Sequence, residues 1–173
     1  MFLLSQISGI IALILVCISY FCKHKGHFLI LQTIANLFYG ASFLILNHYV
    51  AGFITMISIF RCIYIYIGEN HNYKYTEHFL SVFIMSYIIV GIIFFDSYLD
   101  IIPIVTAIMF TIAFVIKNMQ AVRYICIVPN ALLMIYSIIC TTYSNALLDL
   151  LEVVVLVVSI IKFSKNKSKA IIY

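Results

Sequence analysis

The chain has 173 residues, of which 65% are hydrophobic and 9% are charged, and its mean hydropathy is +1.18. Soluble domains carry about 25% charged residues, so this composition excludes a water-soluble globular protein and indicates that lipid is the solvent. The net charge of +4 does not indicate binding to nucleic acid, because the basic residues lie at the ends of apolar stretches and in a C-terminal tail.

Seven stretches of the chain are apolar enough for a helix that crosses a bilayer, which takes about 20 mostly apolar residues. They cover residues 3–22, 28–47, 51–67, 78–95, 99–116, 122–141 and 146–163. No Lys or Arg precedes the first stretch, so we do not expect it to be a cleaved signal peptide. The sequence therefore predicts an all-α membrane protein with seven transmembrane helices.

The distribution of charge predicts the orientation. All ten basic residues fall on one side of the membrane when seven spans alternate, and the opposite side receives Asp96, Asp100 and Asp149. A count of six or eight spans would mix the charges. By the positive-inside rule the N-terminus is expected outside and the C-terminus in the cytoplasm. The abundance of Ile, Tyr, Asn and Lys is typical of an AT-rich genome and favours a bacterial inner membrane.

An odd number of spans allows two three-helix halves with the same orientation on either side of a linker helix, a known plan of transporters. A shift of 94 residues relates the two halves and matches Lys23 with Lys117, Asn36 with Asn130 and Tyr49 with Tyr143. The predicted parts are a first three-helix bundle (1–70), a linker helix (71–97), a second three-helix bundle (98–163) and a basic cytoplasmic tail (164–173). The expected fold is thus a 3+1+3 parallel repeat.

One face of the second stretch is polar. Gln32, Thr33, Asn36, Tyr39 and Gly40 fall there at helical spacing. Hydrocarbon penalises such a face, so it is expected to point into a helix bundle or a wet cavity. We predict that Asn36 and its repeat partner Asn130 face each other near the middle of the membrane. Their amides would bind a neutral polar group, with further contacts from Gln32 and Tyr39.

The last stretch carries an acidic stripe. Asn145, Asp149 and Glu152 lie at positions i, i+4 and i+7. A buried acid costs roughly 2.5–3.5 kcal/mol on insertion scales, so an intramembrane acid points to function. We expect Asp149 and Glu152 to give cation binding or proton coupling, or Glu152 to pair with Arg61. The alternative is a structural ion pair or a carboxyl group that burial keeps protonated.

Arg61 and two prolines complete the set of candidate residues. Arg61 is expected on the cytoplasmic side, either as an ion pair or anion contact at the floor of the cavity, or with its head group snorkelling to the interface. Pro103 and Pro129 are predicted inside helices of the second half. Proline kinks helices, so both are candidates for a gating hinge, with a static kink as the alternative.

No metal, cofactor or catalytic site is expected. The five cysteines form no CxxC pair, and we interpret them as small core or lipid-facing residues. His24 and His27 have no acid or thiol arranged near them in the sequence, so they are interpreted as loop residues rather than zinc ligands. No hydrolase or nucleotide-binding signature is present. Lys165, Lys167 and Lys169 are expected to contact anionic lipid head groups.

Six positions in the first half of the sequence resemble a known family. They are Gln6, Asn36, Tyr39, Gly40, Gly52 and Arg61, and they resemble the YgjV-like family of small bacterial inner-membrane proteins, most strongly over residues 3–70. The 3+1+3 layout is also similar to that of the SWEET sugar transporters and the PnuC vitamin transporters. That resemblance implies a pocket between two three-helix bundles that binds an uncharged or weakly charged metabolite. The chain lacks the Pro-Gln pair typical of SWEETs and has no Trp.

The preferred function is a transporter or facilitator of a small polar metabolite. The partners are then the lipid bilayer and a small solute, and homo-oligomerisation is left open. The alternative is an accessory or scaffold protein that transports nothing, in which helix packing fills the space between the polar stripes. A membrane-embedded enzyme is a third reading, for which Glu152 and Arg61 are the only candidate groups.

Overall fold

The computed structural model describes residues 2–71, 76–95, 97–139 and 143–169, and every regular element in them is a helix. The elements are α1 (Phe2–Tyr20), α2 (Lys25–Ile45), α3 (Tyr49–His71), α4 (Thr76–Ile93), the short 3-10 helix η1 (Tyr98–Asp100), α5 (Ile101–Val115), α6 (Met119–Ile139) and α7 (Tyr143–Lys169). The predicted all-α class is therefore confirmed. Predictions about Lys74, Asp96 and Cys140, and about the side chains of Asn145, Lys165, Lys167 and Lys169, concern parts outside the described residues.

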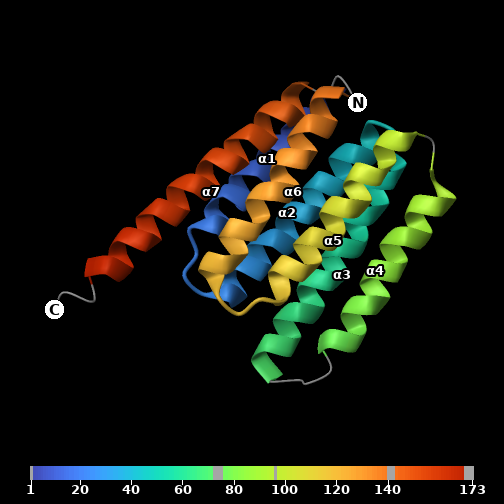
Figure 1. Cartoon of the computed structure of the whole chain (residues 1–173). Coiled ribbons are helices and arrows are strands. Elements are labelled where there is room, and N and C mark those ends of the chain that lie inside the picture. Colours follow the sequence, from blue (N-terminus) through green and yellow to red (C-terminus); the bar gives the residue numbers. More distant parts are fainter. Residues whose placement is uncertain (1, 72–75, 96, 140–142, 170–173) are drawn as a thin grey trace.

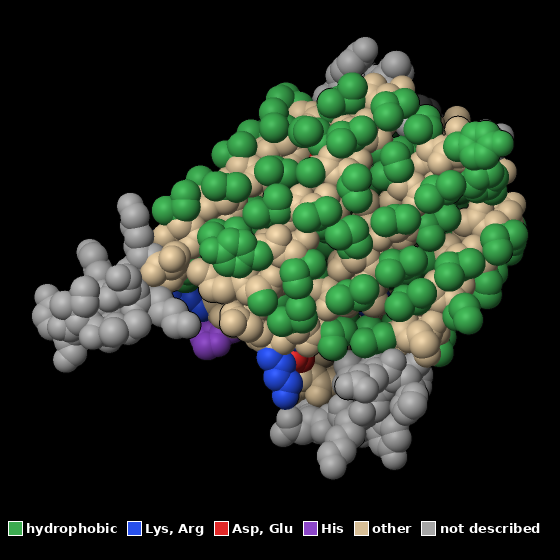
Figure 2. All heavy atoms as spheres, viewed as in Figure 1, with side chains coloured by type: hydrophobic (Ala, Val, Ile, Leu, Met, Phe, Trp, Pro, Cys, Tyr) green, Lys and Arg blue, Asp and Glu red, His purple; other side chains and the backbone are tan. Residues whose placement is uncertain are grey.

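The helices run alternately up and down in one bundle (Figure 1). Within the described residues, four helices are long and apolar enough to cross a membrane, over Lys25–Ile45, Tyr49–Glu69, Tyr98–Val115 and Met119–Ile139. The apolar stretches Ile7–Tyr20 and Leu80–Ile93 are shorter. The bundle shows hydrophobic side chains over the face in view in Figure 2, whereas the charged and His side chains in that view gather at its lower edge. Outward residues such as Phe60 and Ile92, 67% and 73% exposed, suit contact with lipid tails.

Each half of the bundle is built around its middle helix. α2 packs along α1 and α3, and α6 packs along α5 and α7. The two halves meet where α1 contacts α7 and where α3 contacts α5. α4 lies at the edge of the bundle against α3 and α5 (Figure 1). This arrangement leaves the inward faces of six helices to surround a common interior.

Lys25 connects three helices at the end of the bundle where α1 and α5 finish. Lys25, the first residue of α2, is 8% exposed and forms an ion pair with Glu69 near the end of α3. Its ammonium group also donates to the carbonyl of Val115 at the end of α5, at 3.3 Å. A cation at the carboxyl end of a helix is favourable because unpaired carbonyls point there. This ion pair thus joins α2, α3 and α5 at one end of the bundle.

The structure corrects the prediction for Pro103. Pro103 is the third residue of α5 and not an interior residue of a helix. The first four backbone N–H groups of a helix have no partner within it, so a proline there breaks no helical hydrogen bond. Pro129, in contrast, lies inside α6 as predicted. Of the two expected hinge positions, Pro129 alone interrupts a helix.

Candidate functional site

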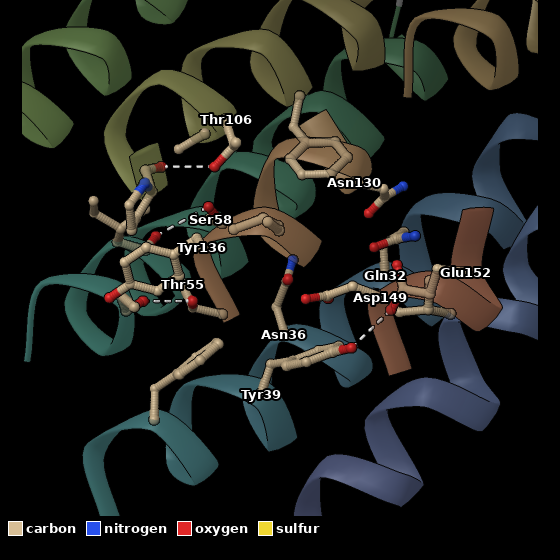
Figure 3. A pocket seen from close by; sticks show the side chains of 18 of the residues that line it. Gln32, Asn36, Tyr39, Thr55, Ser58, Thr106, Asn130, Tyr136, Asp149 and Glu152 are labelled. Atoms are coloured by element: carbon tan, nitrogen blue, oxygen red, sulfur yellow. Dashed lines mark hydrogen bonds between the residues drawn. The ribbon is translucent and has the colours of Figure 1, made fainter. Parts of the chain in front are cut away.

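A cavity of about 110 Å³ lies inside the bundle (Figure 3). Its lining residues come from α1, α2, α3, α5, α6 and α7, and none of them comes from α4. The polar members are Tyr20, Gln32, Asn36, Tyr39, Thr55, Ser58, Arg61, Thr106, Asn130, Tyr136, Ser137, Asp149 and Glu152. A water molecule needs roughly 10–15 Å³ measured in this way, so the cavity has room for a ligand rather than a single water.

Three amide side chains form one part of the lining. The Asn130 amide nitrogen donates to the Cys126 carbonyl at 2.9 Å and to the Tyr20 hydroxyl at 3.3 Å. The Gln32 amide nitrogen donates to the Ser19 hydroxyl at 3.1 Å. The Asn36 amide nitrogen donates to the Cys62 sulfur at 3.7 Å.

Each of these three amide side chains uses its nitrogen, as a hydrogen-bond donor, in the contacts above. The amide oxygens of Gln32, Asn36 and Asn130 accept no hydrogen bond from the residues that the structure describes. An amide oxygen has two acceptor positions. These oxygens are therefore available to hydrogen-bond donors on a ligand.

Two carboxyl groups from α7 form the second part. Glu152 accepts a hydrogen bond of 2.7 Å from the hydroxyl of Tyr39, the contact drawn in Figure 3. Asp149 accepts one of 2.8 Å from the hydroxyl of Ser137. Both acids are buried, at 5% and 6% exposure. Neither forms an ion pair with any described residue, because the pair of Lys25 and Glu69 is the one found in the described part of the chain. The expected alternative of a pair between Glu152 and Arg61 is therefore wrong.

Arg61 forms the third part. It is 3% exposed, and its Nη1 donates to the Ala107 carbonyl at 3.1 Å and to the Thr111 hydroxyl at 2.9 Å, both on α5. The guanidinium carbon lies 4.9 Å from the ring centroid of Phe114. No described group pairs with its buried Nε. The snorkelling alternative is wrong, because the side chain turns into the bundle, where α5 supplies acceptors for it.

The structure brings together most residues that the sequence singled out. Gln32, Asn36, Tyr39, Arg61, Pro103, Asn130, Asp149 and Glu152 all line the cavity. Pro129 does not line it, although it precedes Asn130 in α6. Their expected roles in binding, coupling and hinge motion stay predictions.

Sequence reasoning missed Tyr20 and Tyr136 as members of the lining. Tyr20 is 1% exposed, although its place at the end of an apolar stretch favours the membrane interface. The sequence carries one signal for it, since the 94-residue shift places Tyr20 on a second aromatic residue, Phe114. For Tyr136 the sequence offers no comparable signal.

These features define the class of the protein: a helical, multi-pass membrane protein with a polar cavity in its interior. The sequence matches the Imp-YgjV family, described as bacterial inner membrane protein, over residues 3–167. The chain therefore belongs to the Imp-YgjV family of bacterial inner membrane proteins. No curated protein and no solved structure matches it.

Proposed function

We propose that this protein transports a small polar metabolite across the bacterial inner membrane through the cavity between its two three-helix halves. One observation carries the proposal: Asn36 and Asn130 line a single cavity from equivalent places in the two halves. A protein that only packs helices is expected to fill its interior with side chains, whereas here amide oxygens that accept no hydrogen bond from the described residues line a void. A solute that fills the void satisfies those groups.

The symmetry of the lining supports a parallel repeat. Seven pairs of lining residues are separated by 94 positions: Val16 and Phe110, Tyr20 and Phe114, Asn36 and Asn130, Tyr39 and Leu133, Phe43 and Ser137, Thr55 and Asp149, and Ser58 and Glu152. The same shift relates α1 to α5 and α3 to α7. The contact between α1 and α7 is therefore equivalent to the contact between α5 and α3. We propose that a pseudo-twofold axis passes through the cavity, as in transporters built from parallel repeats.

The proposed topology has seven spans, with the N-terminus outside and the C-terminus in the cytoplasm. It includes α1, α4 and α7 in addition to the four longest apolar helices. The alternating helices and the Lys25 ion pair at the end where α1 and α5 finish support it. In this topology the two acids of α7 lie nearer the outer side than Arg61 does. The repeat equivalent of Glu152 is Ser58, and Arg61 follows Ser58 by three residues toward the cytoplasmic end of α3.

The test uses uptake from a mixture, because the solute is unidentified. Proteoliposomes with the full chain are incubated with a small-molecule extract of bacterial cells, washed, and analysed by mass spectrometry. We expect one or a few polar metabolites inside wild-type vesicles. The double variant Asn36→Ala with Asn130→Ala should lower their uptake by at least about fivefold, because each of the two lost hydrogen bonds contributes about 0.5–1.5 kcal/mol.

The matched control is Thr33→Ala. Thr33 lies on the same helix as Asn36, bonds only the Leu29 carbonyl of its own helix, and does not line the cavity. Its removal should leave uptake unchanged. Uptake that survives the double variant, or no solute enriched over empty liposomes, would refute transport through this pocket.

A further inference from the structure

The charged groups of the cavity do not neutralise one another. Arg61 lies on α3 and bonds neutral groups of α5, whereas Asp149 and Glu152 lie on α7 and bond the hydroxyls of Ser137 and Tyr39. All three are at least nine-tenths buried and line the same cavity. An isolated charge in a low-dielectric interior is costly unless an opposite charge compensates it. Among the described residues, Arg61 therefore has no anionic partner, and the two carboxyl groups have no cationic one.

We propose that the solute is a small zwitterion, with its carboxylate at Arg61 and its ammonium group at Glu152 and Asp149. This inference rests on the proposed function and names the class of its substrate. The Nη2 of Arg61 contacts the Cys62 sulfur at 3.9 Å and has a second N–H that no described group accepts. A guanidinium group binds carboxylates through paired donors, so a carboxylate is the anion that suits it.

The rest of the lining fits such a solute. The free amide oxygens of Gln32, Asn36 and Asn130 can accept N–H donors of an ammonium group or other donors along the molecule. A cation alone leaves Arg61 uncompensated, and an anion alone leaves both acids uncompensated. A neutral solute, the expectation from the sequence, compensates neither. The cavity of about 110 Å³ limits the solute to on the order of ten non-hydrogen atoms.

The test compares molecules of equal size that differ in charge. The first set is L-alanine, L-lactate, L-alaninamide and L-lactamide, which are respectively a zwitterion, an anion, a cation and a neutral molecule. The second set has a longer separation of charges: 4-aminobutyrate, 4-hydroxybutyrate, 4-aminobutanamide and 4-hydroxybutanamide. Binding to the purified full chain is measured by calorimetry and by the shift in melting temperature.

We expect the zwitterion of at least one set to bind at least about tenfold more tightly than its three companions, since hydrogen bonds to charged groups are stronger than those between neutral groups. Glu152→Gln should reduce the preference of the zwitterion over the anion. Arg61→Gln should reduce its preference over the cation, and Arg61→Lys should retain part of it. If an arginine variant does not fold, the wild-type comparison still decides the question.

Two results would overturn the proposal that the solute is a zwitterion. One is a companion molecule that binds as tightly as the zwitterion in both sets, and the other is no binding by any of the eight compounds. The uptake experiment tests the transport proposal separately from the substrate class. Uptake from the extract that requires Asn36 and Asn130, without a preference for zwitterions, refutes the substrate class alone. A clear preference in binding without any uptake refutes transport and leaves the ligand class standing.

Discussion

Arg123 holds the end of α1 against the start of α6. It is 2% exposed, and its Nε and Nη2 donate to the carbonyls of Tyr20 and Cys22 at 3.0 and 2.9 Å. The carbonyls at the end of a helix have no partners within it, so a buried cation there satisfies them directly. The guanidinium carbon also lies 4.2 Å from the ring centroid of Phe163 on α7. One side chain therefore joins three helices and fixes the residue, Tyr20, whose hydroxyl accepts from Asn130.

At this scale we predict that Arg123→Gln lowers the free energy of unfolding by roughly 1.5–3 kcal/mol, because hydrogen bonds from a charged donor are lost. The measurement is unfolding of the purified protein in mixed micelles of increasing SDS content. Lys117→Gln is the control, since it removes a positive charge from an exposed position in the neighbouring connection. Equal losses in the two variants would show that Arg123 contributes only its charge.

At the scale of the element, α6 differs from the other described helices by its interior proline. Pro129 has no N–H to donate to the carbonyl of Ile125, four residues earlier, and Asn130 follows it directly. A helix with a missing hydrogen bond bends more readily at that point. We therefore expect the part of α6 that carries Asn130 to move relative to the part that carries Arg123 during the proposed transport.

Pro129→Ala is predicted to raise the free energy of unfolding by about 0.5–1.5 kcal/mol, because a hydrogen bond to the Ile125 carbonyl becomes available. It should slow uptake several-fold and leave solute binding unchanged. Pro103→Ala serves as the stability control, because in the first turn of α5 the new N–H has no helical acceptor to gain. Unchanged uptake in Pro129→Ala would make the kink a static feature.

At the scale of the whole molecule, the charges and the bundle geometry agree on one orientation. The exposed residues Lys23 and Lys117 lie in connections at the end of the bundle that the Lys25 ion pair closes. The exposed residues Tyr49 and Tyr98 lie at the opposite end, at the start of α3 and in η1. Because the basic residues of the sequence other than Arg61 fall on the first side in a seven-span topology, that side is proposed to be cytoplasmic.

The orientation predicts the reactivity of single cysteine variants. Tyr49→Cys and Tyr98→Cys should react with a membrane-impermeant maleimide on cells whose outer membrane is permeabilised. Lys23→Cys and Lys117→Cys should react only after the inner membrane is opened as well, and labelling of the wild-type chain gives the background from its own cysteines. Reaction of all four variants, or of the lysine variants alone, before the inner membrane is opened would contradict the proposed topology.

The sequence by itself determined the helices, the family and the polar character of the interior. Apolar length and flanking charge are local properties, so the predicted stretches and the observed helices agree to within a few residues at most ends. The face with Gln32, Asn36 and Tyr39 was recognisable because polar groups in a membrane protein must avoid hydrocarbon. Membership of the YgjV-like family, predicted from scattered residues, is confirmed.

Only the tertiary structure decided which groups meet. Periodicity shows that Arg61 and Glu152 avoid lipid, but the partner of each depends on which helix faces it and how its side chain turns. Arg61 binds α5 and Glu152 binds Tyr39, so the expected ion pair does not form. Likewise, Pro103 differs from Pro129 only through where the helix begins, which depends on the turn at η1. Contacts between distant segments set these outcomes, and a one-dimensional pattern does not contain them.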